Sequence, residues 1–353
     1  MNYNVIKMKA LIKLKRIEKK LKVREVASAL GIDQALVSKF ESGNRIPTET
    51  QVLQLAKVLS IDVNELMALW LKEKVINELG NYAQASTALQ MVQEHFQSYK
   101  PKVRLSASIQ ATLDLLEELQ ADLSLLRKND SFRVVEALEL EYTFESNRIE
   151  GNTLTLRETD LVVNKGLTIS GKSMQEHLEA INHQDAIEYV KQMVQSNSVL
   201  TERELLTIHN LVLRGIDPKN AGKYRNVQVM ISGSEHQPPQ PFLVPKMMED
   251  YFIWYSSNRT RLHPVVLAAE MHERLVTIHP FVDGNGRTSR LIMNLILLQH
   301  GYVIANIKGD DSTRMNYYEA LEEVQTGGSK DSFVQLIAET EIESLKRYIS
   351  ILN

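Results

Sequence analysis

The chain has 353 residues, of which 43% are hydrophobic and 24% are charged, as in ordinary globular proteins of two or three domains. It contains no cysteine, which excludes disulfides and thiolate chemistry. No apolar run approaches the roughly 18 residues that a membrane span needs. The N-terminus also lacks a signal-peptide core, so we expect a cytoplasmic protein without membrane contact.

The net charge of −3 conceals a basic N-terminal part. Residues 1–76 hold 14 lysines and arginines against 8 aspartates and glutamates, a net charge of +6, and the remainder carries −9. This asymmetry suggests that the first part meets an anion that the rest of the chain does not.

The first 72 residues are expected to form five short helices. Their predicted ranges are about 6–20, 23–30, 34–42, 49–59 and 63–71. Asp33 is placed to cap the third helix and Gly43 to end it. The stretch from Val23 to Gly43, with its Val-Arg-Glu-Val-Ala-x-x-Leu-Gly-Ile pattern, resembles the helix-turn-helix of phage-repressor-like regulators.

This resemblance implies that the third helix meets the major groove of DNA. The implied groove-facing residues are Gln34, Ala35, Ser38 and Lys39, and the implied phosphate contacts are Arg24 and Arg45. One such domain binds DNA weakly, so a homodimer is expected if DNA is the ligand. The alternative is a small helical bundle that binds protein or only dimerises.

Residues 73–100 are polar and helix-permissive, which predicts a helical linker. Leucines at helical spacing between residues 105 and 126 indicate a core helix of the next domain. A further helical run begins near Ser131 and ends at Gly151. Glu150 then lies in its last turn, where the helix dipole disfavours a carboxylate. Ser146 lies one turn earlier and can hydrogen-bond it. A pairing of Glu150 with a misplaced arginine elsewhere is expected.

The segment from Gly166 to Ser173 fits the P-loop pattern Gly-x-x-x-x-Gly-Lys-Ser. A true P-loop follows a buried strand, whereas the surroundings here read as helical. We therefore interpret the segment as a loop before a helix over 174–195. A P-loop ATPase that uses Lys172 is kept as an alternative.

Residues 227–231 have good β propensity. Ser232, Gly233 and Ser234 form a turn signal, and a return strand would end near 237–239. The pattern predicts a small β-hairpin.

A short loop near residue 280 brings together a histidine, a carboxylate and two arginines. It reads His279-Pro-Phe-Val-Asp-Gly-Asn-Gly-Arg-Thr-Ser-Arg290 and lies between two amphipathic, helix-like runs. Its glycines would let backbone N–H groups approach an anion at the start of the next helix. Arg287 and Arg290 project from one face of that helix's first turn, where cations oppose the helix dipole unless a polyanion is bound.

These residue types favour a magnesium–nucleotide site beside a general base. Asp283 is the expected Mg²⁺ ligand, because Mg²⁺ is usually held by one or two carboxylates plus substrate phosphates. His279 is the expected proton acceptor, because an ordinary histidine titrates near neutrality. The alternative is a tight turn in which His279 caps a helix and the arginines are solvated.

The loop also matches the Fic family signature, His-Pro-Phe-x-x-Gly-Asn-Gly-Arg-x-x-Arg, at every fixed position. The resemblance implies a protein adenylyltransferase, which transfers AMP from Mg-ATP to a Ser, Thr or Tyr hydroxyl of a target protein and releases pyrophosphate. His279 would take the hydroxyl proton and Asp283 would hold Mg²⁺. The implied nucleotide-binding residues are Gly284, Asn285, Gly286, Arg287 and Arg290.

Two further stretches are similar to parts of the same family. Ser146-x-x-x-Glu150-Gly151 resembles its inhibitory motif, whose glutamate pairs with the second signature arginine, here Arg290, and blocks the ATP γ-phosphate. This implies self-inhibition, and some members with this glutamate also remove AMP. The hairpin resembles the family's flap, which holds a target segment by strand-like pairing. The implied docking residues are Val229, Met230, Ile231, Ser232 and Gly233. An exposed glutamate and an ordinary hairpin are the alternatives.

The expected architecture is mainly α-helical. It comprises a five-helix helix-turn-helix domain over 1–72, a helical linker over 73–100, and an all-α Fic domain over 101–353 with a small β-hairpin flap. Within the latter we expect an inhibitory helix near 131–151 and a catalytic core at about 175–310. A rival function remains, namely a DNA-binding transcriptional regulator whose Fic domain only senses ATP.

Overall fold

A computed structural model describes residues 8–80, 82, 84–89, 106–126, 132–231 and 233–352. The chain divides into two compact units, residues 1–102 and 103–353, which are described separately here. Both units are helical, which confirms the predicted mainly α-helical class. In the part of the chain that the structure describes, every helix is too short or too polar to cross a lipid bilayer.

The N-terminal unit is a bundle of five helices. They are α1 (Met8–Glu18), α2 (Val23–Leu30), α3 (Gln34–Ser42), α4 (Glu49–Leu59) and α5 (Val63–Leu79). All five contribute to one apolar core, in which Ile12, Val26, Phe40, Leu55 and Leu66 are buried. The middle three helices have the predicted bounds, whereas α5 continues to Leu79 instead of ending near residue 71.

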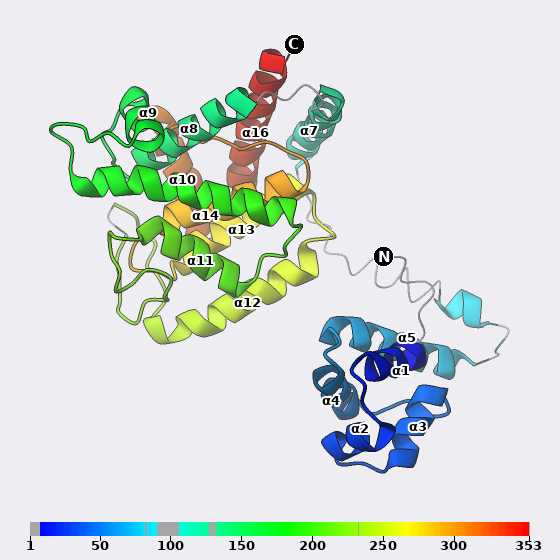
Figure 1. The fold of residues 1–353 in the computed structure, drawn as a ribbon. Coiled ribbons are helices and arrows are strands. Elements are labelled where there is room, and N and C mark those ends of the chain that lie inside the picture. The colour runs from blue at the N-terminus through cyan, green and yellow to red at the C-terminus, as the bar shows by residue number, and fades with distance from the viewer. Residues whose placement is uncertain are drawn as a thin grey trace. The chain divides into compact units, whose positions relative to one another are not determined.

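The second unit carries the remaining helices. They are α7 (Ala107–Leu126), α8 (Phe132–Ile149), α9 (Leu156–Lys165), α10 (Met174–Gln195), α11 (Glu202–Leu213), the short 3₁₀ turn η2 (Pro241–Leu243), α12 (Val244–Asn258), α13 (Pro264–Ile278), α14 (Asn285–Gln299), α15 (Asp311–Gln325) and α16 (Asp331–Leu352). Figure 1 shows α10 and α11 crossing in front of α13 and α14.

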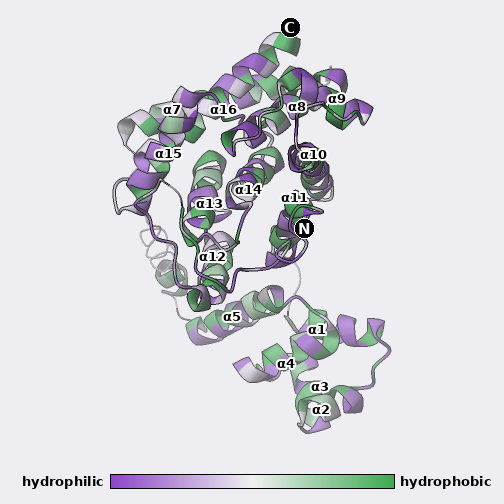
Figure 2. Ribbon diagram, turned by 90° about the vertical axis from the view of Figure 1, so that its left-hand side faces the viewer, coloured by the Kyte–Doolittle hydropathy of each residue, from purple (hydrophilic) through white to green (hydrophobic). Residues whose placement is uncertain are grey.

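Helices α13 and α14 form the centre of this unit. Of their 15 residues each, 11 in α13 and 12 in α14 are buried. Figure 2 shows the two helices in the middle of a ring made by α7, α8, α10, α11, α12, α15 and α16. Because the loop of residues 279–284 joins two largely buried helices, its backbone is held on both sides.

The predicted hairpin over 227–239 is wrong for the described residues, which contain no strand there. Side chains bridge the segment in place of a backbone ladder: the Arg225 guanidinium donates to the carbonyls of Val227 and Pro239, and Gln228 donates to that of Pro238. Consecutive prolines remove the N–H donors that a return strand needs. Of the predicted docking residues, Met230 is 90% exposed, and Ser232 lies outside the described residues.

The P-loop-like segment has no strand before it. It follows α9, which ends at Lys165, and its first residue, Gly166, caps that helix with a φ of 63°. Ser173 then caps α10 by accepting a hydrogen bond from the Glu176 N–H, and Lys172 donates to both oxygens of Thr153. The predicted loop before a helix over 174–195 is confirmed, and the geometry removes the support for a P-loop ATPase.

Candidate active site

The loop between α13 and α14 is braced from within. His279 ends α13 in the left-handed conformation, with a φ of 49°. The Asn285 amide closes the loop by donating to the Phe281 carbonyl and accepting from the Phe281 N–H, both at 3.0 Å. The side chain of Asn285 is therefore committed to holding the loop, which leaves the backbone N–H groups at the start of α14 to meet a ligand.

The hydrogen bonds of His279 assign its tautomer. Its Nδ1 lies 3.3 Å from the Val276 carbonyl, which can only accept, so Nδ1 carries the proton and Nε2 keeps its lone pair. Arg225 donates to the His279 carbonyl at 2.7 Å and fixes the backbone there. Burial lowers the pKa of His279 to about 4, against a weaker opposing effect of the Val276 bond. The ring is neutral at pH 7, so Nε2 carries the lone pair that a general base needs.

His209 supports the loop from α11, a role that sequence reasoning missed. Its Nδ1 accepts from the Gly222 N–H at 2.9 Å, so its Nε2 donates to the Asp283 carbonyl at 2.9 Å. The ring stacks on Phe281 with centroids 3.6 Å apart. Burial lowers its pKa to about 4, so it stays neutral. Nothing in its local sequence distinguishes it from a core histidine.

Asp283 presents the carboxylate of the loop to solvent, with a side chain 53% exposed. Its Oδ1 accepts from the Gly284 N–H at 2.6 Å, and its Oδ2 lies 3.4 Å from Arg287 Nη2. The described residues include no cluster of three or more potential metal-binding side chains. A Mg²⁺ ion here would therefore take the remaining ligands from phosphates and water, which is how Mg²⁺ is commonly held.

Arg290 is buried, with a side chain 1% exposed, and it joins α14 to the end of α8. Its Nε donates to the Ser146 hydroxyl at 3.0 Å, and its Nη2 donates to the Ser146 carbonyl at 2.9 Å and to Glu150 Oε1 at 2.7 Å. The pairing of Glu150 with Arg290 that the sequence predicted is present, and Gly151 follows with a φ of 94°.

The Glu150 carboxylate lies against the first turn of α14. A Cβ atom at Gly286 would come within 2.3 Å of Glu150 Oε1, so a larger residue there would require this carboxylate to shift. Burial alone would raise the pKa of Glu150, but the charges of Arg290 and Arg287 outweigh it and lower that pKa below its ordinary value. A charged carboxylate thus lies at a helix N-terminus that favours anions.

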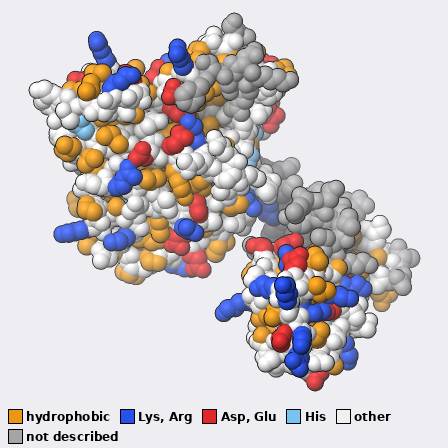
Figure 3. Space-filling view, viewed as in Figure 1, with side chains coloured by type: hydrophobic (Ala, Val, Ile, Leu, Met, Phe, Trp, Pro, Cys, Tyr) orange, Lys and Arg blue, Asp and Glu red, His pale blue; other side chains and the backbone are white. Residues whose placement is uncertain are grey.

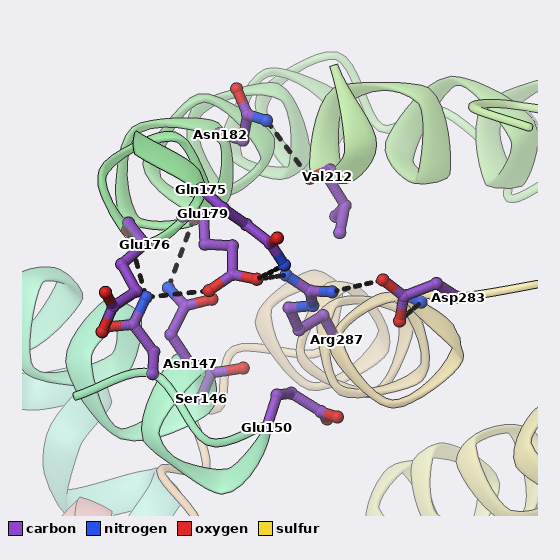
Figure 4. Close-up of polar contacts among 12 residues, drawn as sticks. Ser146, Asn147, Glu150, Gln175, Glu176, Glu179, Asn182, Val212, Asp283 and Arg287 are labelled. Atoms are coloured by element: carbon purple, nitrogen blue, oxygen red, sulfur yellow. Dashed lines mark hydrogen bonds and ion pairs between the residues drawn. The ribbon is translucent and has the colours of Figure 1, made fainter. Parts of the chain in front are cut away.

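Arg287 is equally buried, with a side chain 3% exposed, and its partner was not foreseen. Its Nη1 lies 3.4 Å from Oε1 of Glu179, which comes from α10 (Figure 4). Glu179 belongs to a buried polar row on α10 that also includes Asn182 and His183. This row at helical spacing was a readable signal that α10 faces a polar site.

The end of α8 is held by other elements as well. Tyr318 of α15 donates to the Ile149 carbonyl at 3.1 Å. The Gly309 N–H donates to Glu145 at 2.8 Å, and Asn152 donates to Glu179 at 2.9 Å. The position of Glu150 is thus set by contacts from three separate parts of the unit.

A model of the Fic/DOC family matches residues 199–297, the stretch that contains this loop. This chain contains a Fic domain. A helix-turn-helix family model matches residues 12–66, within the N-terminal unit. The Fic domain and its flanks are 36% identical over 220 residues to a protein named protein adenylyltransferase Fic from Nematostella vectensis, covering 62% of this chain and 50% of that one.

Two other similarities extend over more of the chain. A protein adenylyltransferase Fic from Culex quinquefasciatus is 34% identical over 258 residues, covering 69% of this chain and 51% of that protein. A crystal structure of a Fic domain-containing signalling protein from Bacteroides thetaiotaomicron has a TM-score of 0.59 and 28% identity, covering 70% of this chain and 97% of the other. The chain spans about half the length of the named adenylyltransferases.

The predicted DNA-binding residues all lie on the surface of the N-terminal unit. These exposed residues are Arg24, Gln34, Ala35, Ser38, Lys39 and Arg45. Asp33 caps α3 by accepting from the Ala35 N–H at 2.6 Å, and Gly43 ends it with a φ of 81°, as predicted. Figure 3 shows lysine and arginine side chains spread over the visible face of this unit.

Proposed function

We propose that the Fic domain is a protein adenylyltransferase that transfers AMP from ATP to a hydroxyl group of a target protein. The observation that carries the proposal is the arrangement around α14. A neutral histidine with a free Nε2 lies next to a helix N-terminus, and two buried arginines lie in that helix's first turns. Such a site suits a triphosphate that reacts with a hydroxyl nucleophile.

In the proposed reaction the target hydroxyl oxygen attacks the α-phosphorus of ATP. A bond forms between them, the bond from that phosphorus to pyrophosphate breaks, and Nε2 of His279 takes the hydroxyl proton. Arg287 and Arg290 bind the β- and γ-phosphates. The backbone N–H groups of Gly284 to Gly286 stabilise the charge that develops during transfer.

Asp283 is the residue that would hold Mg²⁺, and the half-exposed carboxylate fits that role. When bound, the ion neutralises phosphate charge. Asp283 is kept in place by its own bond to the Gly284 N–H and by His209, which fixes its carbonyl.

We also propose that Glu150 restrains this reaction. Its carboxylate lies where the α14 N-terminus and Arg290 would otherwise meet a terminal phosphate, and its own negative charge repels that phosphate. ATP can then bind productively only when the end of α8 moves. With Glu150 in place, the same carboxylate could orient water for removal of AMP.

The target segment is proposed to bind along residues 229–233. These residues are not paired in a strand in the part of the chain that the structure describes, and Met230 is 90% exposed. An extended target segment could pair with this backbone through main-chain hydrogen bonds, which depend little on the sequence of the target.

The N-terminal unit is proposed to bind DNA through α3. Its exposed face carries Lys39 and is flanked by Arg24 and Arg45, and the unit matches a helix-turn-helix model. This observation favours a second candidate function, in which nucleotide binding by the Fic domain regulates DNA binding. A homodimer would place two α3 helices on DNA.

Transfer of label from ATP to protein tests the proposed reaction. The Glu150→Gly variant is incubated with a cell lysate and ATP labelled on either the α- or the γ-phosphate. We expect α-label but no γ-label on protein. This transfer should be lost in Glu150→Gly with His279→Ala and retained with Lys172→Ala. His300→Ala, a matched change at an exposed histidine, should retain it as well. Transfer of γ-label would indicate a kinase, and no transfer despite ATP binding would favour the regulator.

A further inference from the structure

Glu179 and Arg287 form a buried ion pair beneath the proposed phosphate site. Glu179 is 9% exposed and Arg287 3% exposed, and the closest atoms, Oε1 and Nη1, are 3.4 Å apart. Burial of either charge alone would cost several kcal/mol. The pair therefore constrains where the guanidinium can lie.

The Glu179 carboxylate is itself fixed through both oxygens. Gln175, one turn earlier in α10, donates to Oε1 at 3.0 Å, and Asn152 donates to Oε2 at 2.9 Å. Figure 4 shows Glu179 between the guanidinium of Arg287 on one side and the end of α8 on the other. A carboxylate held in this way has a fixed position and therefore fixes the guanidinium that pairs with it.

Not every N–H donor of Arg287 makes a hydrogen bond within the described residues. Its other acidic neighbour is the half-exposed Asp283, with Oδ2 at 3.4 Å from Nη2. Among the described residues, its buried Nε has no hydrogen-bond partner, and Nη1 faces Glu179 as an ion pair without a hydrogen bond. The guanidinium is thus oriented by charge on two sides while donors remain for a ligand rich in oxygen atoms.

We propose that Glu179 is a positioning residue that holds Arg287 in the orientation that binds the ATP triphosphate. The inference rests on the proposed function. Without the charge of Glu179, Arg287 turns toward Asp283, the carboxylate proposed for Mg²⁺. Because Asn152 follows the inhibitory Glu150 by two residues, the same carboxylate also joins the arginine to the segment that ends α8.

Nucleotide binding measured by calorimetry on the full-length chain tests this role. All variants carry Glu150→Gly, and the ligands are Mg-ATP and AMP, which lacks the β- and γ-phosphates. Glu179→Gln keeps the side-chain shape but removes its charge. The matched control is Glu188→Gln, on the same helix with a side chain that is 53% exposed and pairs with Lys191. We expect Glu179→Gln to weaken ATP binding about tenfold, equivalent to about 1.4 kcal/mol, with AMP affinity unchanged. Glu188→Gln should change neither.

A double-mutant cycle separates positioning from a general loss of structure. In a background that also carries Arg287→Ala, Glu179→Gln should cause no further loss of ATP affinity. Retained AMP affinity shows that each variant is folded. Three results would each overturn this inference without affecting the proposed function. They are equal weakening of ATP and AMP binding by Glu179→Gln, unchanged ATP affinity in that variant, and a full additional loss of ATP affinity in the Arg287→Ala background. Failure of the Glu150→Gly parent to bind ATP would overturn the proposed function and this inference with it.

Discussion

The protonation of His279 decides whether it can act as a base. Burial, helped by the charge of Arg225, lowers its pKa to about 4, and the Val276 bond and the Glu150 charge oppose this shift only in part. A lowered pKa means that the ring is neutral above about pH 5 and charged only as the pH falls through about 4. An ordinary histidine would change charge near pH 6.5.

Proton NMR of the free protein measures this directly. The ring resonance of His279, assigned by its loss in His279→Gln, should keep a constant chemical shift from pH 8 down to about 5.5. The exposed His300 serves as an internal comparison in the same spectra. A midpoint for His279 near pH 6.5 would contradict the environment described here.

Gly286 gives a second prediction at the residue scale, because the space for its Cβ is taken by Glu150 Oε1. Alanine is ordinarily favoured over glycine within a helix by up to about 1 kcal/mol. We expect Gly286→Ala to lower the melting temperature when Glu150 is present and to leave it unchanged or raise it in Glu150→Gly. The coupling free energy should be about 1–3 kcal/mol. Purely additive effects in thermal denaturation would show that the two residues do not meet.

At the scale of elements, the position of α8 sets the proposed inhibition. The hydrogen bond from Tyr318 to the Ile149 carbonyl anchors its last turn from α15. Loss of one such bond costs about 1 kcal/mol, so Tyr318→Phe should raise AMP transfer about two- to fivefold by releasing Glu150 more often. Activity of Tyr318→Phe in the Glu150→Gly background should equal that of Glu150→Gly alone. An increase there as well would assign Tyr318 a different role.

Local patterns predicted the helices and the anion loop well. The bounds of α2, α3, α4 and α10 follow from caps and glycines. Charges that oppose their helix dipoles predicted that Glu150 pairs with an arginine of the loop, and the family resemblance pointed to Arg290. The hairpin prediction was wrong because it rested on β propensity and ignored that Pro238 and Pro239 lack N–H donors. It also could not show that the Arg225 side chain binds the carbonyls of this segment. His209 was missed because its partner lies far away in the sequence and leaves no local signal. Glu179 was missed although it belongs to a polar row at helical spacing on α10, because the sequence alone does not show that Arg287 faces this row.

For the whole molecule, the sequence divides charge between the two units. Residues 1–76 carry +6 and the remainder −9, which suits a polyanion on the N-terminal unit. We expect the full-length chain to bind a mixed-sequence DNA duplex more weakly as salt rises. Arg45→Ala should lower affinity at every sequence and reduce the salt slope by about one unit. Lys246→Ala, an exposed change in the Fic domain, is the matched control. If Arg45→Ala left the dependence of DNA affinity on salt concentration unchanged, Arg45 would not contact a DNA phosphate.

The central claim is that Glu150 restrains an AMP transfer that depends on His279. Intact-mass analysis of purified protein after incubation with Mg-ATP tests it most directly. We expect self-modification by one AMP that is strong in Glu150→Gly, weak in the unmodified sequence, and absent from Glu150→Gly with His279→Ala. An adduct that is as abundant in the unmodified sequence as in Glu150→Gly, or that survives the loss of His279, would contradict the account.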